Sequence, residues 1–172
     1  MTRAEPVIRL AEPGDLPAIT EIYNHYVRET HITFDVESYD WRDRQAWFGR
    51  FDAAGRYPLL VLTEQGRLVG YAHALPLKDR AAYDTSVETT IYLNPDAGGR
   101  GLGTRLYSAL LARLETRDIH KAYGLIALPN AGSLALHEKL GFVKVGLLHE
   151  VGRKFGRYYD VQWVERTFEN RI

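Results

Sequence analysis

Residues 94–105 read NPDAGGRGLGTR, and four of the six residues from 98 to 103 are glycine. The alternating run SVETTIYL (86–93) precedes this stretch, and the run LYSALLARLE (106–115), with leucines at helical spacing, follows it. The sequence therefore predicts a strand, a tight turn and a helix. The first backbone N–H groups of a helix have no partner within it and attract phosphate. A ligand-free turn that only needs the flexibility of glycine explains the motif equally well.

Two nucleotide-binding patterns do not fit this turn. The dinucleotide pattern G-x-G-x-x-G fails because Gly99 and Gly101 are followed by Thr104 at the last position. The P-loop pattern fails because Gly98 and Gly103 have its spacing, but Thr104 stands in place of the required lysine. What remains is a helix N-terminus whose missing side chains would let a pyrophosphate approach closely.

The rest of the chain alternates strands and helices. Asp15 is the expected N-cap of a first helix, and a second helix is expected from Asp40 to Gly55. A third follows the glycine turn, and a short fourth covers about 133–140. Strands are expected at 7–10, 57–64, 67–75, 87–93, 122–128, 142–151 and 158–168. The predicted order is β-α-α-β-β-β-α-β-α-β-β, an α/β fold in a single domain over 1–172.

Composition excludes several classes of function. The 172 residues include 22 basic and 22 acidic side chains, so no excess of charge indicates a nucleic-acid or membrane binder. No apolar run approaches the length of a membrane helix or of a signal peptide core, and we expect a soluble cytoplasmic protein. Cysteine is absent, which excludes disulfides and a thiolate nucleophile. The six histidines lack helical metal-ligand spacing, and no metal is expected.

Two motifs carry a resemblance to a known family. The run RGLGTRL (100–106) after IYLNP (91–95), with NAGSLALHEKLGF at 130–142, resembles the acetyl-CoA motifs of the GCN5-related N-acetyltransferase (GNAT) superfamily. The resemblance narrows to the phosphinothricin and methionine sulfoximine N-acetyltransferase branch through IYNHYV (22–27), ITF (32–34), RYPLLV (56–61), KDRAAYDTSVETTIYL (78–93) and GRKFGRYYDV (152–161). It implies a mixed, mostly antiparallel central sheet flanked by helices.

The resemblance implies acetyl-CoA as the co-substrate. The family holds the pyrophosphate with a Gln/Arg-x-x-Gly-x-Gly/Ala loop, and here Gly98 occupies the first position, so the backbone is expected to do most of the binding. Arg100 or Arg105 is available as a charged partner, although an ordinary surface role is as plausible for each. The side-chain amide of Asn130 is expected at the cofactor, with a helix-entry role as the alternative. The implied cofactor-binding residues are Ile91, Tyr92, Leu93, Gly99, Arg100, Gly101, Leu102, Gly103, Thr104 and Asn130.

Two residues are expected to carry the chemistry, which is direct attack of an amine on the thioester. Strand alternation places Glu88, Thr90 and Tyr92 on one face, and a carboxylate within an apolar strand has a raised pKa, as a general base requires. An exposed surface glutamate is the alternative. His137 occupies the position where many relatives have a tyrosine that protonates the departing thiolate. A structural histidine is the alternative.

The loop at 76–84 is expected to bind the substrate. A small amino acid analogue presents a carboxylate and a second polar group, and Lys78, Arg80 and Tyr83 supply suitable partners, with a solvated surface loop as the alternative. Phe34 is expected as an apolar wall, and Glu88 and Thr90 as further substrate contacts. A peptide N-terminal acetyltransferase and a non-catalytic acetyl-CoA-binding module stay open as alternatives. A homodimer is expected, and the segment 152–160 completes either the pocket or the subunit contact.

Overall fold

The structure is a computed structural model that describes residues 5–169. Its element order confirms the predicted β-α-α-β-β-β-α-β-α-β-β sequence. Short 3₁₀ turns cover Pro13–Asp15, Ala81–Tyr83 and Pro95–Ala97. The strands and α-helices are β1 (Val7–Leu10), α1 (Leu16–Glu29), α2 (Gln45–Phe48), β2 (Leu59–Glu64), β3 (Arg67–Pro76), β4 (Ser86–Leu93), α3 (Leu102–Glu115), β5 (Lys121–Ala127), α4 (Ala131–Lys139), β6 (Val143–Lys154) and β7 (Arg157–Thr167).

The seven strands form one sheet in the order β1-β2-β3-β4-β5-β7-β6. The pair β4–β5 is parallel and the other neighbouring pairs are antiparallel, which confirms the expected mixed sheet. The β2–β3 and β6–β7 hairpins turn at Gln65-Gly66 and Phe155-Gly156, where both central residues have positive φ. This conformation matches the right-handed twist of the paired strands.

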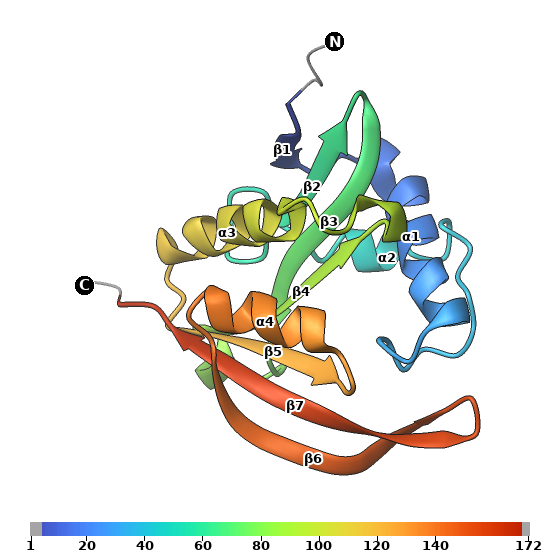
Figure 1. The fold of residues 1–172 in the computed structure, drawn as a ribbon. Coiled ribbons are helices and arrows are strands. Elements are labelled where there is room, and N and C mark those ends of the chain that lie inside the picture. Colours follow the sequence, from blue (N-terminus) through green and yellow to red (C-terminus); the bar gives the residue numbers. More distant parts are fainter. Residues whose placement is uncertain (1–4, 170–172) are drawn as a thin grey trace.

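Helices cover both faces of the sheet, as Figure 1 shows for α3 on one side and α1 and α2 on the other. The side chains of β2 alternate between the two layers, because successive residues of a strand point to opposite faces. Leu60 and Leu62 belong to the cluster that contains the leucines of α3, whereas Leu59 and Val61 pack with the isoleucines of α1. The sheet is therefore buried on both faces in its central part.

The parallel pair β4–β5 separates along its length. The two strands pair at Ser86, Val87 and Glu88, and no pairing continues beyond Glu88 among the residues that the structure describes. The remainder of β4 still pairs with β3 on its other edge, up to Leu93. The sheet therefore opens into a fork between β4 and β5, and Glu88 lies at the point where the strands diverge.

One local expectation was wrong, and a second was confirmed in position alone. The helix expected from Asp40 to Gly55 is a single turn, because the Asp40 carboxylate accepts a hydrogen bond from the Arg42 backbone N–H (2.8 Å) and stabilises a turn before α2. Asp15 is the N-cap residue of α1, as expected, but its side chain makes no capping hydrogen bond. Its carboxylate instead accepts two bonds from Arg9 (2.7 and 2.8 Å) and one from the Glu12 N–H.

Candidate active site

A cavity of about 430 Å³ lies against one face of the sheet. Its walls come from the loop after α1, from α2 and its preceding turn, and from four strands. The predicted common face of Glu88, Thr90 and Tyr92 is confirmed, because all three line this cavity, and Phe34 lines it as expected. The full lining is Tyr23, Ile32, Thr33, Phe34, Asp35, Tyr39, Asp43, Arg44, Trp47, Tyr71, His73, Glu88, Thr90, Tyr92, Leu125, Ala127 and Val161.

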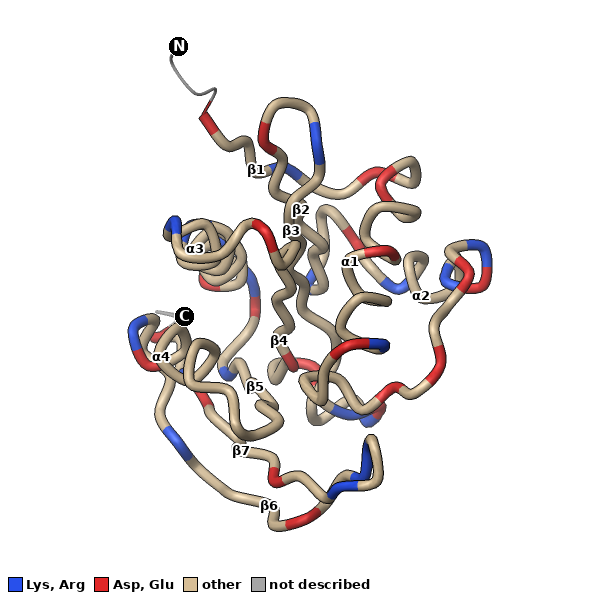
Figure 2. The backbone as a smooth tube through the Cα atoms, turned by 45° about the vertical axis from the view of Figure 1, so that its right-hand side comes forward, with Lys and Arg blue, Asp and Glu red and all other residues tan. Residues whose placement is uncertain are grey.

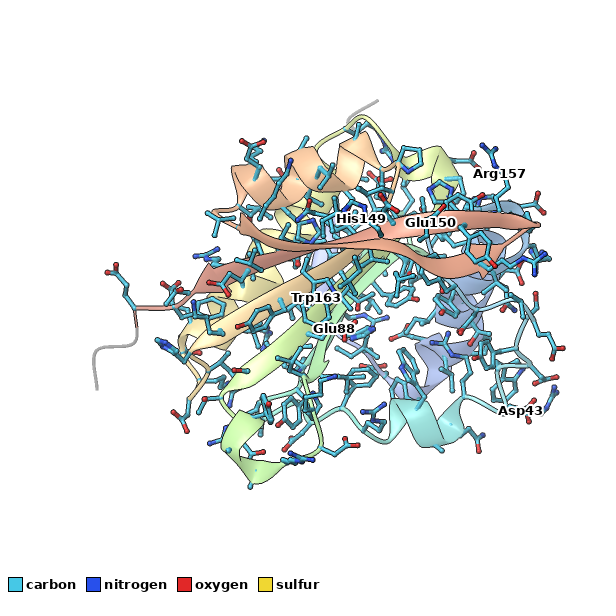
Figure 3. The ribbon with its side chains drawn as sticks, turned by 90° about the horizontal axis from the view of Figure 1, so that it is seen from below. Asp43, Glu88, His149, Glu150, Arg157 and Trp163 are labelled. Atoms are coloured by element: carbon cyan, nitrogen blue, oxygen red, sulfur yellow. The ribbon has the colours of Figure 1, made fainter. Side chains whose placement is uncertain are left out.

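Glu88 has the environment of a carboxylate with a raised proton affinity. Burial raises the pKa of its carboxyl group above the ordinary value, and the positive charge of Lys78 opposes part of this rise. Figure 3 shows Glu88 near the middle of the molecule, beneath the β6–β7 hairpin, with Asp43 at the periphery. Glu88 is half-buried and lines the cavity, where its carboxylate can exchange a proton with a bound molecule.

A second cavity of about 110 Å³ lies in the fork between β4 and β5. It shares Glu88, Thr90 and Tyr92 with the first cavity, so the two meet at the predicted base. The α4 side contributes Asn130, Ser133 and His137. Its other lining residues are Ile32, Leu125 and Ala127, which also line the first cavity, and Thr89, Ile91 and Ile126.

Both ring nitrogens of His137 are occupied. The side chain is buried, with 5% of the residue exposed, and Nδ1 lies 2.8 Å from the Ser133 carbonyl oxygen. A carbonyl only accepts, so Nδ1 carries the proton and Nε2 is the acceptor for the Tyr107 hydroxyl, 3.0 Å away. Burial lowers the pKa of His137 and keeps the ring neutral. The structural role is evident, and a role in catalysis stays a prediction.

Asn130 begins α4. Its side-chain oxygen accepts a hydrogen bond from the Ser133 N–H (3.1 Å), which confirms the helix-entry alternative. The same side chain lines the cavity in the fork. A further contact between its amide group and a cofactor stays a prediction.

The glycine turn enters α3 through Gly101, which has φ 72° and precedes the first helical residue. Leu102 points into the core with 3% of its surface exposed, so only its backbone faces outward. The Arg100 guanidinium makes two hydrogen bonds of 2.8 Å to the Glu64 carboxylate on β2, and is therefore engaged at the hairpin. The backbone of the turn is the part that is suited to a phosphate group.

The predicted substrate loop lies apart from the cavity. Lys78, Arg80 and Tyr83 are exposed, and none of the three lines either cavity. Lys78 still acts on Glu88 through its charge. A direct contact of this loop with substrate stays a prediction.

Sequence reasoning missed the polar residues at the α2 side of the cavity. Arg44 and Trp47 are one helical turn apart. His73 and Tyr71 are two residues apart on β3 and therefore share the face that lines the cavity. A histidine in the middle of an apolar strand, and an arginine three residues before a tryptophan, were the available signals. Neither signal identified a partner, because the contacts join segments about 30 residues apart.

The β6–β7 hairpin contributes Val161 of β7 to the cavity and packs behind Phe34. A Cβ atom at Gly152 would collide with the Phe34 ring, so only glycine allows this ring to lie against β6. Buried Lys154 donates a hydrogen bond of 2.8 Å to the Thr33 carbonyl and holds the hairpin end to the same loop. The segment 152–160 therefore supports Phe34 and the loop around Thr33, although none of its residues lines either cavity, and its role in the pocket or in a subunit contact stays a prediction.

Gly152→Ala is expected to push the Phe34 ring into the cavity. For the amine and acetyl-CoA that the sequence resemblance implies, we expect the KM for the amine to rise about tenfold, in line with the cost of overpacking a site. The KM for acetyl-CoA should change little, because Phe34 does not line the cavity in the fork. Steady-state kinetics with each substrate varied in turn provide the measurement. Gly146→Ala on the same strand is the control, since a Cβ there meets nothing within 4 Å. Equal KM values for both variants would contradict this role of Phe34.

No cluster of three or more His, Cys, Asp or Glu side chains that could hold a metal ion occurs in the part of the chain that the structure describes. Within residues 5–169, none of the helices combines the length and the apolar character needed to cross a membrane.

Comparisons with known proteins define the class. Residues 8–163 match the family model described as the acetyltransferase (GNAT) domain, and the chain belongs to this family. It is 48% identical to a phosphinothricin N-acetyltransferase of Streptomyces coelicolor, over 95% of this chain and 96% of that protein. It is 37% identical to an L-methionine sulfoximine/L-methionine sulfone acetyltransferase of Pseudomonas paraeruginosa, over 94% of each chain. A crystal structure of a GNAT superfamily phosphinothricin acetyltransferase from Sinorhizobium meliloti in complex with acetyl-CoA has a TM-score of 0.90 and 32% identity, over 95% of this chain and 88% of that one.

Proposed function

We propose that this protein is an acetyl-CoA-dependent N-acetyltransferase that acetylates the α-amine of a small amino acid analogue such as phosphinothricin or methionine sulfoximine. The observation that carries the proposal is the meeting of two cavities at Glu88, one of a size that suits a small ligand and one in the fork between β4 and β5. The names of the relatives support the substrate class.

The geometry supports direct transfer with Glu88 as general base. The amine is mostly protonated near neutral pH and must lose a proton before it can attack. Glu88 takes this proton, the amine nitrogen forms a bond to the thioester carbonyl carbon, the C–S bond breaks and the thiolate leaves. A carboxylate with a raised pKa is a better proton acceptor than a solvated one.

The fork and the glycine turn fit acetyl-CoA. In the fork, the β4 backbone at Ile91 and Tyr92 does not pair with β5, which leaves room for strand-like bonds to the pantetheine arm. The backbone of residues 99–104, at the start of α3, suits the pyrophosphate. The Leu93 carbonyl already accepts a hydrogen bond of 2.6 Å from the Tyr26 hydroxyl, so this residue has less capacity for the arm.

A thiol-release assay with acetyl-CoA tests the function against its alternatives. The amines are L-phosphinothricin, L-methionine sulfoximine, ordinary amino acids and short peptides with free N-termini. Release with the two analogues is the expected result. Release with peptides alone would assign the protein to the N-terminal acetyltransferases. Measurable acetyl-CoA binding without release from any amine would leave only a non-catalytic module.

We also infer a homodimer that uses β6. This strand ends the sheet, and Val143, Val145, Leu147, Leu148 and Val151 are each 41 to 59% exposed. Figure 2 shows no charged residue along the middle of β6, in contrast to the charged loops elsewhere. An exposed apolar edge strand is prone to pair with another chain. Light scattering coupled to size-exclusion chromatography measures the molar mass in solution, and a monomer at micromolar concentration would contradict the dimer.

A cytoplasmic location stays a prediction.

A further inference from the structure

Arg44 is a buried cation without a carboxylate partner. The residue is 6% exposed, and its guanidinium lies over the Trp47 ring at 3.9 Å and over the Tyr23 ring at 4.8 Å. No ion pair joins Arg44 to an acidic side chain within residues 5–169. Cation–π contacts compensate part of the lost hydration, but a charge removed from water without an opposite charge is costly. An anion bound in the cavity would remove this cost.

Two buried polar atoms of residues that line this cavity lack hydrogen-bond partners. They are Arg44 Nη1 and His73 Nδ1, and both belong to residues that line the same cavity as Glu88. Buried side-chain polar atoms nearly always have a partner, so two such atoms on residues that line one cavity indicate a missing ligand group. Burial, together with the positive charge of Arg44, lowers the pKa of His73 to about 3. The imidazole is therefore neutral and can donate or accept according to its tautomer.

Asp35, an acidic side chain that lines the same cavity, is already engaged by two of the aromatic residues around Arg44. Asp35 accepts hydrogen bonds from the hydroxyl groups of Tyr23 (2.6 Å) and Tyr39 (3.0 Å). The rings of these two tyrosines lie against the Arg44 guanidinium, at 4.8 and 5.6 Å from their centroids. The phenols thus hold the cation in place and use the Asp35 carboxylate themselves. Arg44 lines the cavity, and its Nη1 atom keeps an unused hydrogen-bond donor.

The position of this pair relative to Glu88 follows from the strand register. His73 is directly opposite Thr90, and Leu75 is opposite Glu88. Two residues along a strand correspond to about 7 Å. A group that binds at His73 and Arg44 is therefore separate from a group that gives its proton to Glu88, yet one small amino acid spans both. The amine and an anionic group of the same molecule can be held at once.

We propose that Arg44 and His73 form a subsite that binds an oxyanion of the amine substrate while Glu88 meets its amine. The inference rests on the proposed function and adds the residues that select an acidic substrate. Guanidinium matches the geometry of carboxylate and phosphinate oxygens, and the aromatic cage strengthens the attraction by excluding water. The oxyanion is either the α-carboxylate or the side-chain phosphinate, because both present the same chemistry.

Arg44→Met tests this subsite, since methionine keeps an unbranched apolar stem and removes the charge. We expect the KM for L-phosphinothricin to rise roughly 10- to 100-fold, which is the range for losing a hydrogen bond to a charged group. The KM for acetyl-CoA should stay near the wild-type value. Arg44→Lys keeps the positive charge and should recover part of the loss. An unchanged amine KM in a folded Arg44→Met protein would overturn the proposal.

A second substrate identifies which oxyanion binds. L-Methionine sulfone has an α-carboxylate and an uncharged side chain. Equal rises in KM for it and for L-phosphinothricin would assign the subsite to the α-carboxylate, and a larger rise for L-phosphinothricin would assign it to the phosphinate. Either pattern supports the subsite.

Binding calorimetry separates this proposal from the proposed function. L-Phosphinothricin is titrated into the wild type and Arg44→Met, each with and without coenzyme A, so that no turnover is required. Binding by the wild type that is lost in the variant supports the subsite even if no thiol is ever released. Absence of binding to the wild type, or equal binding to both proteins, overturns it.

If Arg44→Met does not fold, His73→Phe serves as the second variant, because it keeps an aromatic ring packed against Trp47 and Phe51 and removes the nitrogen atoms. An amine KM raised at least threefold is then expected, in line with one lost hydrogen bond, and an unchanged value overturns the proposal.

Discussion

Glu88→Gln is expected to lower kcat by about 10² to 10⁴-fold, the range that a general base contributes. Glutamine has nearly the same shape but cannot accept a proton, so the packing at the β4–β5 fork should be kept. The KM for acetyl-CoA is expected to stay near the wild-type value. Steady-state kinetics over a range of pH provide the measurement. A variant that matches the wild type in kcat at every pH would remove Glu88 as the base.

The raised pKa of Glu88 also predicts the pH dependence. As a base, Glu88 acts when ionised, so wild-type activity should fall as the pH drops through its folded-state pKa, which lies above the ordinary value of 4.5. Because the folded pKa is higher than the unfolded one, this group contributes stability below the unfolded pKa and loses it as the pH rises through the folded pKa. Glu88→Gln lacks this ionisation and should therefore melt at a higher temperature than the wild type at pH 7.

Glu165→Gln is the matched control, because Glu165 lies on β7 and pairs with Lys121 at 2.7 Å, away from both cavities. The Lys121 hydrogen bond lowers the pKa of Glu165, so its contribution to stability is present above the unfolded pKa and is lost as the pH falls. Glu165→Gln should keep full activity and melt slightly lower at pH 7. The two variants thus have opposite expected effects on the melting temperature, and only Glu88→Gln is expected to lower the activity.

Gly101→Val is expected to raise the KM for acetyl-CoA about 100-fold and to leave the KM for the amine nearly unchanged. Gly101 has φ 72°, a conformation that costs roughly 1–2 kcal/mol for a residue with a Cβ and more for a β-branched one. Relief of this strain would turn the backbone N–H groups away from the pyrophosphate, and the branched side chain would occupy the approach. Kinetics with acetyl-CoA as the varied substrate measure the effect.

Gly98→Ala provides the comparison within the same turn. Gly98 has φ −66°, which any residue adopts, and a Cβ atom there would lie 3.8 Å from the Pro95 carbonyl oxygen, an ordinary contact. Its KM for acetyl-CoA should stay within about twofold of the wild type, as for a surface substitution. The proposed binding of the pyrophosphate by the backbone of residues 99–104 would be contradicted if Gly101→Val had no greater effect than Gly98→Ala.

Much of the fold could be predicted because its signals are local. Strand alternation and helical spacing of apolar residues depend on the nearest neighbours along the chain, and the observed order of elements agrees with them. The helix expected from Asp40 to Gly55 is the main exception. There the aromatic residues pack around His73 on β3, and the Asp40 carboxylate stabilises a turn, so tertiary packing and a side-chain bond override the helical pattern.

The sequence by itself determined that one glycine-rich turn opens a helix, and that Glu88, Thr90 and Tyr92 share a face. Both follow from the stereochemistry of short segments. Only the tertiary structure decided where β4 and β5 part, that Arg100 is engaged with Glu64, and that Arg44 and His73 lie in the same cavity as Glu88. These facts depend on contacts between segments that are distant in the sequence. Arg44 becomes a buried cation only when the fold brings the aromatic rings of α1, the following loop and α2 around its guanidinium.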